Sequence, residues 1–155
     1  IAILGIGGAV GLGIHGALAV SVWIVAFIVV GGTLVVAYNL ELFGGVLHSD
    51  LWFALGWGAF PVLTGAFAQT GRMTLAAVVA AAACAAVSAA QRALSTPVRH
   101  VRRHVVRVDG VAEMAGGGAE TIDRGTLLGP PEAGLRLLSL AMPLLAGGLL
   151  AARLA

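Results

Sequence analysis

Long apolar stretches alternate with short polar segments along the chain. Residues Ile1–Leu40 contain no charged side chain and are about twice as long as the roughly 20 residues that a helix needs to cross a bilayer's hydrocarbon core. A weak break at Gly11–Gly16 divides this stretch into a shortened helix ending near Ile14 and a full span over Ala17–Tyr38. Three further spans are predicted at Leu51–Ala68, with a kink at Pro61, and at Thr74–Ala90 and Leu135–Ala155.

The composition explains why these stretches are expected to cross a membrane. Of 155 residues, 59% are hydrophobic and only 10% are charged, whereas a soluble domain has about 25% charged residues. So short a chain cannot bury that much apolar surface. Cys84 is the only cysteine, which excludes an intramolecular disulfide. We therefore expect an all-α, multi-pass transmembrane helix bundle of about five spans.

The polar segments suggest how the chain is organised. Residues 1–94 are expected to hold four transmembrane helices, 95–134 a basic, glycine-rich loop, and 135–155 the fifth helix. In the loop, Ser95-Thr96-Pro97 resembles a helix start, and valines at helical spacing alternate with arginines. This pattern predicts a basic amphipathic helix on the membrane surface. A competing interpretation is a hairpin over Val105–Val111 that turns at Asp109-Gly110. Turns are also expected at Gly116–Gly118 and Pro130-Pro131.

The arginines predict the orientation. The chain has nine basic residues, all arginine, and six of them lie in the segment 91–134. Positive loops are retained in the cytoplasm, so this segment and the loop Asn39–Asp50 are expected on the cytoplasmic face of a cell membrane. The turn Gln69–Met73 then lies outside. With a net charge of only +2, nucleic acid is not an expected partner.

The most polar constellation near the bilayer lies between the second and third spans. Tyr38 and Asn39 end one span, and Glu41, His48 and Asp50 follow before the next. An amide, an imidazole and carboxylates could contact a polar substrate or act as bases. The less specific interpretation is an interfacial tyrosine followed by solvated loop residues.

This constellation resembles the middle of the UbiA-type intramembrane prenyltransferases. The matching residues are Ala37-Tyr38-Asn39-Leu40 at a helix end and Phe53-Ala54-Leu55-Gly56-Trp57-Gly58-Ala59-Phe60-Pro61 in the next helix, with the turn Gln69-Thr70-Gly71 after it. The resemblance implies that these helices correspond to the third through seventh of the family's nine. It also implies that the chain begins inside a longer protein. Binding or transfer of a prenyl diphosphate at the cytoplasmic face is the implied activity.

The resemblance implies Mg²⁺ as a cofactor, held by two aspartate-rich motifs. The second motif should fall within 91–134, where Asp109 and Glu113 are the candidate ligands. The neighbouring Arg99, Arg102, Arg103 and Arg107 repel a cation but would attract the phosphate groups of lipids, at about 1 kcal/mol each.

The basic stretch also supports an alternative: a non-catalytic membrane subunit that binds lipid or takes part in assembly. His100 and His104 stand four residues apart, and their spacing would suit zinc. The arginines between them disfavour a metal.

Overall fold

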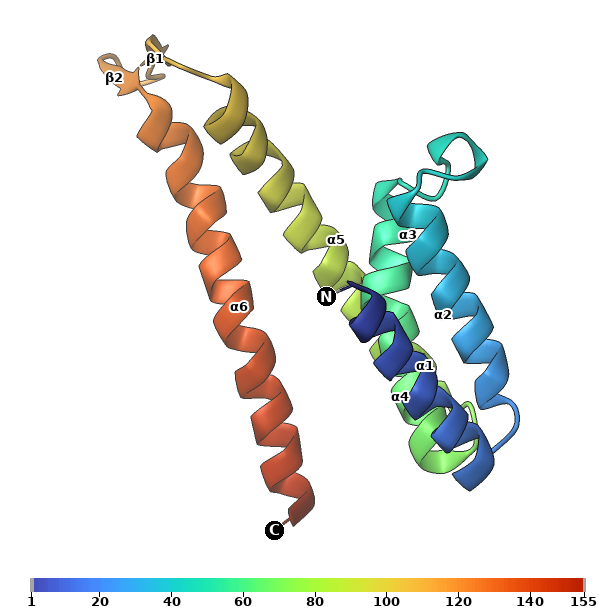
Figure 1. Cartoon of the computed structure of the whole chain (residues 1–155). Helices are drawn as coiled ribbons and strands as arrows, with labels where there is room; N and C mark the ends of the chain where they lie inside the picture. Colours follow the sequence, from blue (N-terminus) through green and yellow to red (C-terminus); the bar gives the residue numbers. More distant parts are fainter. Residues whose placement is uncertain (1, 155) are drawn as a thin grey trace. The chain divides into compact units, whose positions relative to one another are not determined.

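The computed structural model describes residues Ala2–Leu154 (Figure 1). It is 77% helical, so the helical fold class is confirmed, with one short hairpin in addition. Contacts divide the chain into two compact units, with the boundary between Ala89 and Ala90. Because this boundary falls inside one helix, each unit contains part of that helix.

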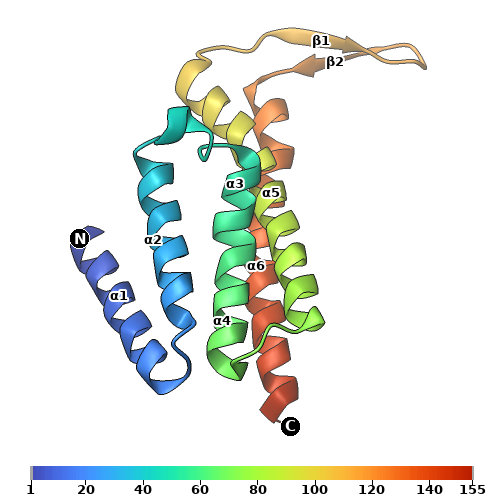
Figure 2. The same ribbon diagram turned by 90° about the vertical axis from the view of Figure 1, so that its right-hand side faces the viewer.

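The first two helices form an antiparallel pair, α1 (Ala2–Ala19) and α2 (Ile24–Asn39) (Figure 2). The break expected at Gly11–Gly16 was wrong, because α1 continues to Ala19 and the chain turns just after it. Gly13 instead faces α2: a Cβ there would lie 2.7 Å from the side chain of Ile28. Membrane helices use glycine in this way to approach closely.

The third predicted span is one helical segment with an irregular middle. It consists of α3 (Asp50–Phe53), the π-helix η2 (Ala54–Ala59) and α4 (Phe60–Thr70). The irregularity expected at Pro61 thus takes the form of a π-helical stretch just before it. Proline has no N–H to donate to the preceding turn, so the regular hydrogen-bond pattern is interrupted there, and π-helical turns occur mostly as such local interruptions of α-helices.

The loop between α2 and α3 and the turn after α4 lie where the sequence indicated. The loop contains the short 3-10 helix η1 (Phe43–Gly45). Gly71 ends α4 in the left-handed conformation, with φ of 65°, and donates its N–H to the Phe67 carbonyl oxygen at 2.7 Å. This is the helix ending that favours glycine.

The next helix, α5 (Leu75–His104), is much longer than expected. Ser95 does not begin a new helix; its hydroxyl donates to the Arg92 carbonyl at 3.2 Å within the same helix. Pro97 lies in the helix interior. The basic stretch is therefore a direct continuation of the fourth span, and the expected separate helix on the membrane surface is wrong.

A hairpin follows α5, formed by the antiparallel strands β1 (Gly110–Glu113) and β2 (Ala119–Ile122). The hairpin alternative was correct in kind but wrong in place. The chain turns at Met114–Gly118, where Gly117 and Gly118 have positive φ, and not at Asp109-Gly110. The glycine run therefore forms the turn that its composition predicted.

The last helix, α6 (Arg124–Leu154), begins eleven residues before the expected fifth span. Pro130 and Pro131 lie inside it, so the turn expected there was wrong. The carbonyl groups that these prolines leave without their usual helical donor belong to Thr126 and Leu127, two exposed residues in the first turn of the helix. Much of the segment 95–134 is thus helix or hairpin.

Three helices of the described chain are long and apolar enough to cross a membrane: Asp50–Thr70, Leu75–His104 and Arg124–Leu154. The helices α1 and α2 are apolar but shorter. At 1.5 Å per residue, the 16 residues of α2 reach only about 24 Å.

Candidate functional site

Four ring-bearing side chains gather where α2 ends and α3 begins. The ring of Tyr38 stacks on His48, with centroids 4.4 Å apart and planes at 25°. Trp57 lies 4.5 Å from Tyr38, and Phe53 stacks on Trp57 at 5.6 Å with planes at 6°. Aromatic pairs add about 0.5–1.5 kcal/mol each beyond their burial. This aromatic cluster therefore attaches the loop to the helices on both sides of it.

The backbone further constrains His48. With the proton on Nδ1, the imidazole donates a hydrogen bond to the Tyr38 carbonyl oxygen at 3.3 Å. In that tautomer Nε2 is an acceptor. An imidazole fixed by stacking and by one ring nitrogen is suited to receive a proton or a hydrogen bond with the other.

The loop itself is strained next to this cluster. Glu41 and Phe43 have positive φ values of 50° and 59°, although neither is glycine. Such residues cost on the order of 1–3 kcal/mol each and concentrate at binding and catalytic sites. The strain therefore favours a specific role for this loop over that of a simple connector.

The sequence-predicted polar residues are only partly brought together. Tyr38 and His48 are in contact, but the Asn39 amide donates to the Val35 carbonyl at 2.7 Å and is engaged with its own helix. Glu41 is exposed near the start of the loop, and Asp50 is the first residue of α3.

An apolar cavity of about 590 Å³ lies between α1, α2 and the segment η2–α4. Its volume is within the 300–1,000 Å³ typical of ligand pockets. The residues that line it include Ile6, Gly13, Ile28, Gly32, Val36, Trp57, Phe60, Thr64 and Ala68. The Thr64 hydroxyl donates to the Phe60 carbonyl at 2.8 Å, so its donor is already used. The cavity is suited to a hydrocarbon chain.

Trp57 connects the cavity with the aromatic cluster, since it belongs to both. The sequence pattern included this residue only within a motif and indicated no role of its own for it. The UbiA-type resemblance implied an apolar cavity for a polyisoprenoid chain, but it did not indicate which residues line it. The available signal was the group of glycines Gly13, Gly16, Gly31 and Gly32, all of which line the cavity.

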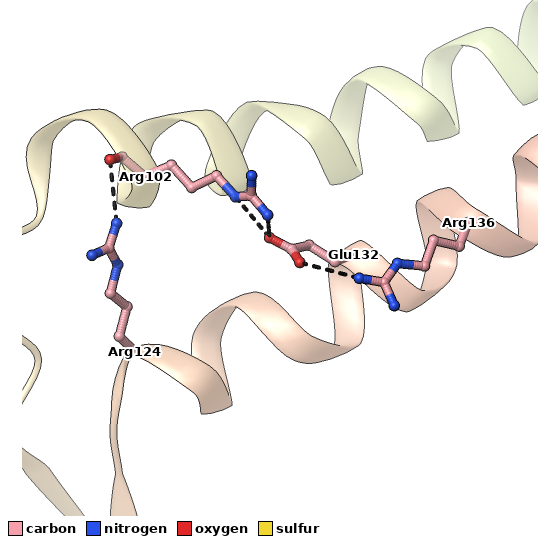
Figure 3. Close-up of polar contacts among 4 residues, drawn as sticks. All are labelled: Arg102, Arg124, Glu132 and Arg136. Carbon is pink, nitrogen blue, oxygen red and sulfur yellow. Dashed lines mark hydrogen bonds and ion pairs between the residues drawn. The ribbon is translucent and has the colours of Figure 1, made fainter.

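The candidate lipid-binding arginines fall into two groups. Arg102 is held by Glu132 at 2.7 Å, and Arg124 donates to the Arg102 carbonyl oxygen at 3.2 Å (Figure 3). Arg107 forms an ion pair with Asp109. Arg99 and Arg103 are exposed, and no carboxylate of the described chain forms an ion pair with either.

The candidate Mg²⁺ ligands lie on and beside the hairpin. Asp109 is engaged with Arg107, while Glu113 pairs with Ala119 at the far end of β1. At about 3.3 Å per residue, the strand places Glu113 roughly 10 Å beyond Gly110. The two carboxylates are therefore too far apart to share one ion. Across residues 2–154, no group of three or more His, Cys, Asp or Glu side chains is arranged to hold a metal.

Asp123 has a structural role at the start of α6. Its Oδ1 accepts hydrogen bonds from the Thr126 N–H at 2.8 Å and from the Thr126 hydroxyl at 3.0 Å. The backbone hydrogen bond and then the hydroxyl lower the pKa of Asp123, because both stabilise the carboxylate. This is a helix cap in its charged form.

Comparison of the chain with protein-family models, with curated proteins and with solved structures finds no match. The resemblance to the UbiA type therefore depends on the motif residues around Tyr38 and Trp57.

Proposed function

We propose that the chain is an integral membrane protein of the UbiA type that binds a polyisoprenoid lipid. Its surface supports the membrane setting. Leu12 and Leu18 of α1 are 76% and 85% exposed, and Leu149 of α6 is 66% exposed. Apolar surface this extensive is unfavourable in water and favourable among lipid chains.

The observation that carries the proposal is the apolar cavity that adjoins the aromatic cluster. Apart from Trp57 and Thr64, whose hydroxyl is already hydrogen-bonded, the residues that line the cavity are apolar or glycine. Such a lining suits an isoprenoid chain. Trp57 extends from the cavity lining to Tyr38 and His48. A bound lipid would thus have its chain between the helices and its polar end at the loop Asn39–Asp50.

The residues that carry the resemblance lie at the end of α2 and in the π-helical part of the next span, next to the cavity and the loop. Tyr38 is one residue before the end of α2, and Trp57-Gly58 lies in the π-helix just before Pro61. In the proposed orientation this loop faces the cytoplasm, and a diphosphate head would meet Tyr38, His48 and the strained Glu41 backbone.

Because Asp109 and Glu113 do not fit a shared Mg²⁺ site, the proposal is limited to binding. Mg²⁺-dependent transfer to an acceptor is the enzymatic extension of the proposal. A lipid-binding membrane subunit is the alternative.

A titration of the detergent-solubilised protein with geranylgeranyl diphosphate tests the proposal, with tryptophan fluorescence as the signal and Trp57→Phe to assign it. Geranylgeraniol should bind too, whereas inorganic diphosphate should not change the signal. Mg²⁺-dependent release of diphosphate, with the prenyl group transferred to an added acceptor, would identify a transferase, and binding without that transfer in the presence of the acceptor would support the binding protein.

Two glycine variants give a matched pair. Gly32 lines the cavity and Gly65 does not, and a Cβ at either position meets nothing within 4 Å. Gly32→Leu should weaken binding at least about tenfold, the effect of about 1.4 kcal/mol, because its side chain fills the cavity. Gly65→Leu should bind normally. Equal binding by both variants would show that the lipid does not occupy this cavity.

A further inference from the structure

The end of α5 carries a second feature, which depends on the proposed membrane setting but not on the cavity. The helix has 30 residues and is about 45 Å long, whereas the hydrocarbon core is about 30 Å thick. Twenty residues counted from Leu75 end at Leu94. The side chain of Leu94 lies 3.1 Å from the Cβ position of Gly134, immediately before the apolar part of α6. Residues 95–104 therefore continue about 15 Å past the core.

This projecting part of the helix has two different faces. Val98 and Val101 are buried. Arg99 and Arg103 lie one helical turn apart on a face directed away from these valines, and both are exposed. Arg99 donates to the Thr96 hydroxyl of its own helix at 3.4 Å.

Arg99 and Arg103 differ from the neighbouring arginines in whether a carboxylate pairs with them. Arg102 is paired with Glu132 and Arg107 with Asp109. Along α5 itself there is no acidic residue. Arg99 and Arg103 are thus the exposed cations of this stretch whose charge is not offset by a described ion pair.

Their height above the core suits lipid phosphates. Counted from Leu94, Arg99 lies about 7.5 Å and Arg103 about 13.5 Å further along the helix axis, and the headgroup layer is roughly 5–7 Å thick on each side. Helical side chains point toward the N-terminus, which for α5 is the direction of the bilayer. Both guanidinium groups can therefore reach back to the phosphate level.

We infer that Arg99 and Arg103 form a binding site for the phosphate group of an anionic phospholipid at this end of α5. Two guanidinium groups one turn apart can hold one phosphate by bidentate, charge-assisted hydrogen bonds. The site selects anionic over zwitterionic lipid because its two positive charges are not offset by neighbouring carboxylates.

The test uses the full chain in nanodiscs made of equal parts phosphatidylcholine and phosphatidylglycerol, with retained lipid counted by native mass spectrometry. The wild type should retain phosphatidylglycerol preferentially. Arg103→Gln should reduce the preference about fivefold and Arg99→Gln/Arg103→Gln about thirtyfold, as about 1 and 2 kcal/mol would. Arg107→Gln, which removes a charge already offset by Asp109, should change it less than twofold.

Three outcomes would overturn the inference: no preference in the wild type, equal loss in Arg107→Gln, or displacement of the lipid by millimolar inorganic phosphate. The double variant should keep the wild-type melting temperature and normal geranylgeranyl diphosphate binding. Normal binding with no lipid preference would refute this site alone and leave the proposed function intact.

Discussion

Each of the two compact units is stabilised internally by a different kind of interaction. In residues 2–89, helices approach closely at Gly13, Gly31 and Gly58 and are joined by stacked rings, and few side chains are charged. In residues 90–154, the polar end is organised by ion pairs, a helix cap and a hairpin. A Cβ at Gly58 would lie 2.6 Å from the Cys84 carbonyl oxygen, whereas Arg102 and Glu132 meet with side chains that are 60% and 20% exposed. Adding even one methyl group to a closely packed helix contact is expected to destabilise the fold, whereas removing one charge of a solvent-accessible ion pair is expected to have a small effect.

The largest effect is expected from labelling across the membrane. Two predicted spans, Asp50–Thr70 and Leu75–His104, separate the loop at Val46 from the hairpin at Met114. In a Cys84→Ala background, Val46→Cys and Met114→Cys should react with an impermeant maleimide from the same side of the membrane. Arg72→Cys should react only from the opposite side.

This result would place the polar parts of both units in one compartment. Reaction of Val46→Cys and Met114→Cys from opposite sides would refute both the expected number of spans between them and the proposed UbiA-type topology.

A methyl group at Gly58 should be the most damaging small change in the first unit. It meets the backbone of α5 at Cys84 and Ala85, which cannot rotate away. Gly58→Ala should lose about 1–3 kcal/mol of unfolding free energy through overpacking. Thermal unfolding in detergent would measure it.

Gly56→Ala is the control for that change, because its Cβ meets nothing within 4 Å in the same π-helix. It should be neutral or stabilising, since alanine is the better helix former by about 1 kcal/mol. Similar melting temperatures for the two variants would contradict the close packing of Gly58 against the backbone of α5.

The ion pair of the second unit should matter less. Glu132→Gln removes the acidic partner that Arg102 and Arg136 share and should lose about 1 kcal/mol, because the Arg102 side chain of the closer pair is 60% exposed. The loss should shrink at high salt. Glu120→Gln on the hairpin, which forms no ion pair in the described chain, should be neutral. An equal loss in both variants would show that charge removal alone is responsible.

The smallest effect concerns the cap of α6 and depends on pH. Because the pKa of Asp123 is lowered in the folded state, its stabilising effect is complete above the unfolded pKa of about 4. It is lost as the pH falls through the folded pKa. Hydrogen exchange of the Thr126 amide should accelerate, relative to its intrinsic rate, below about pH 4.

Asp123→Asn keeps a capping oxygen but no charge, so this acid-dependent change should disappear in that variant. A change that persists in Asp123→Asn would have to come from another group.

Sequence patterns predicted best where a local signal is unambiguous. The glycine that ends α4 and the polar loop before Asp50 follow from local chemistry. The patterns gave the wrong local structure most often at proline and glycine residues that lie inside helices. Pro97, Pro130 and Pro131 indicated helix starts or turns but lie within α5 and α6, and Gly13 indicated a break but faces Ile28.

The candidate site shows the same division. Tyr38 and His48 were both singled out, yet their stacking depends on how the loop folds back onto α2. Asp109 and Glu113 are four residues apart, a spacing that suggested a pair of Mg²⁺ ligands. The extended strand β1 instead holds their carboxylates far from each other. Spacing along a chain becomes distance only after the local conformation is known.

The amino-acid sequence alone determined that this chain is helical and suited to a bilayer, because apolar stretches of sufficient length have few other stable arrangements. The tertiary structure decided which glycines receive a neighbouring helix, where the apolar cavity opens beside Trp57, and which arginines retain a charge that no carboxylate offsets. These features depend on contacts between residues far apart in the chain, and a linear pattern of side chains does not specify such contacts.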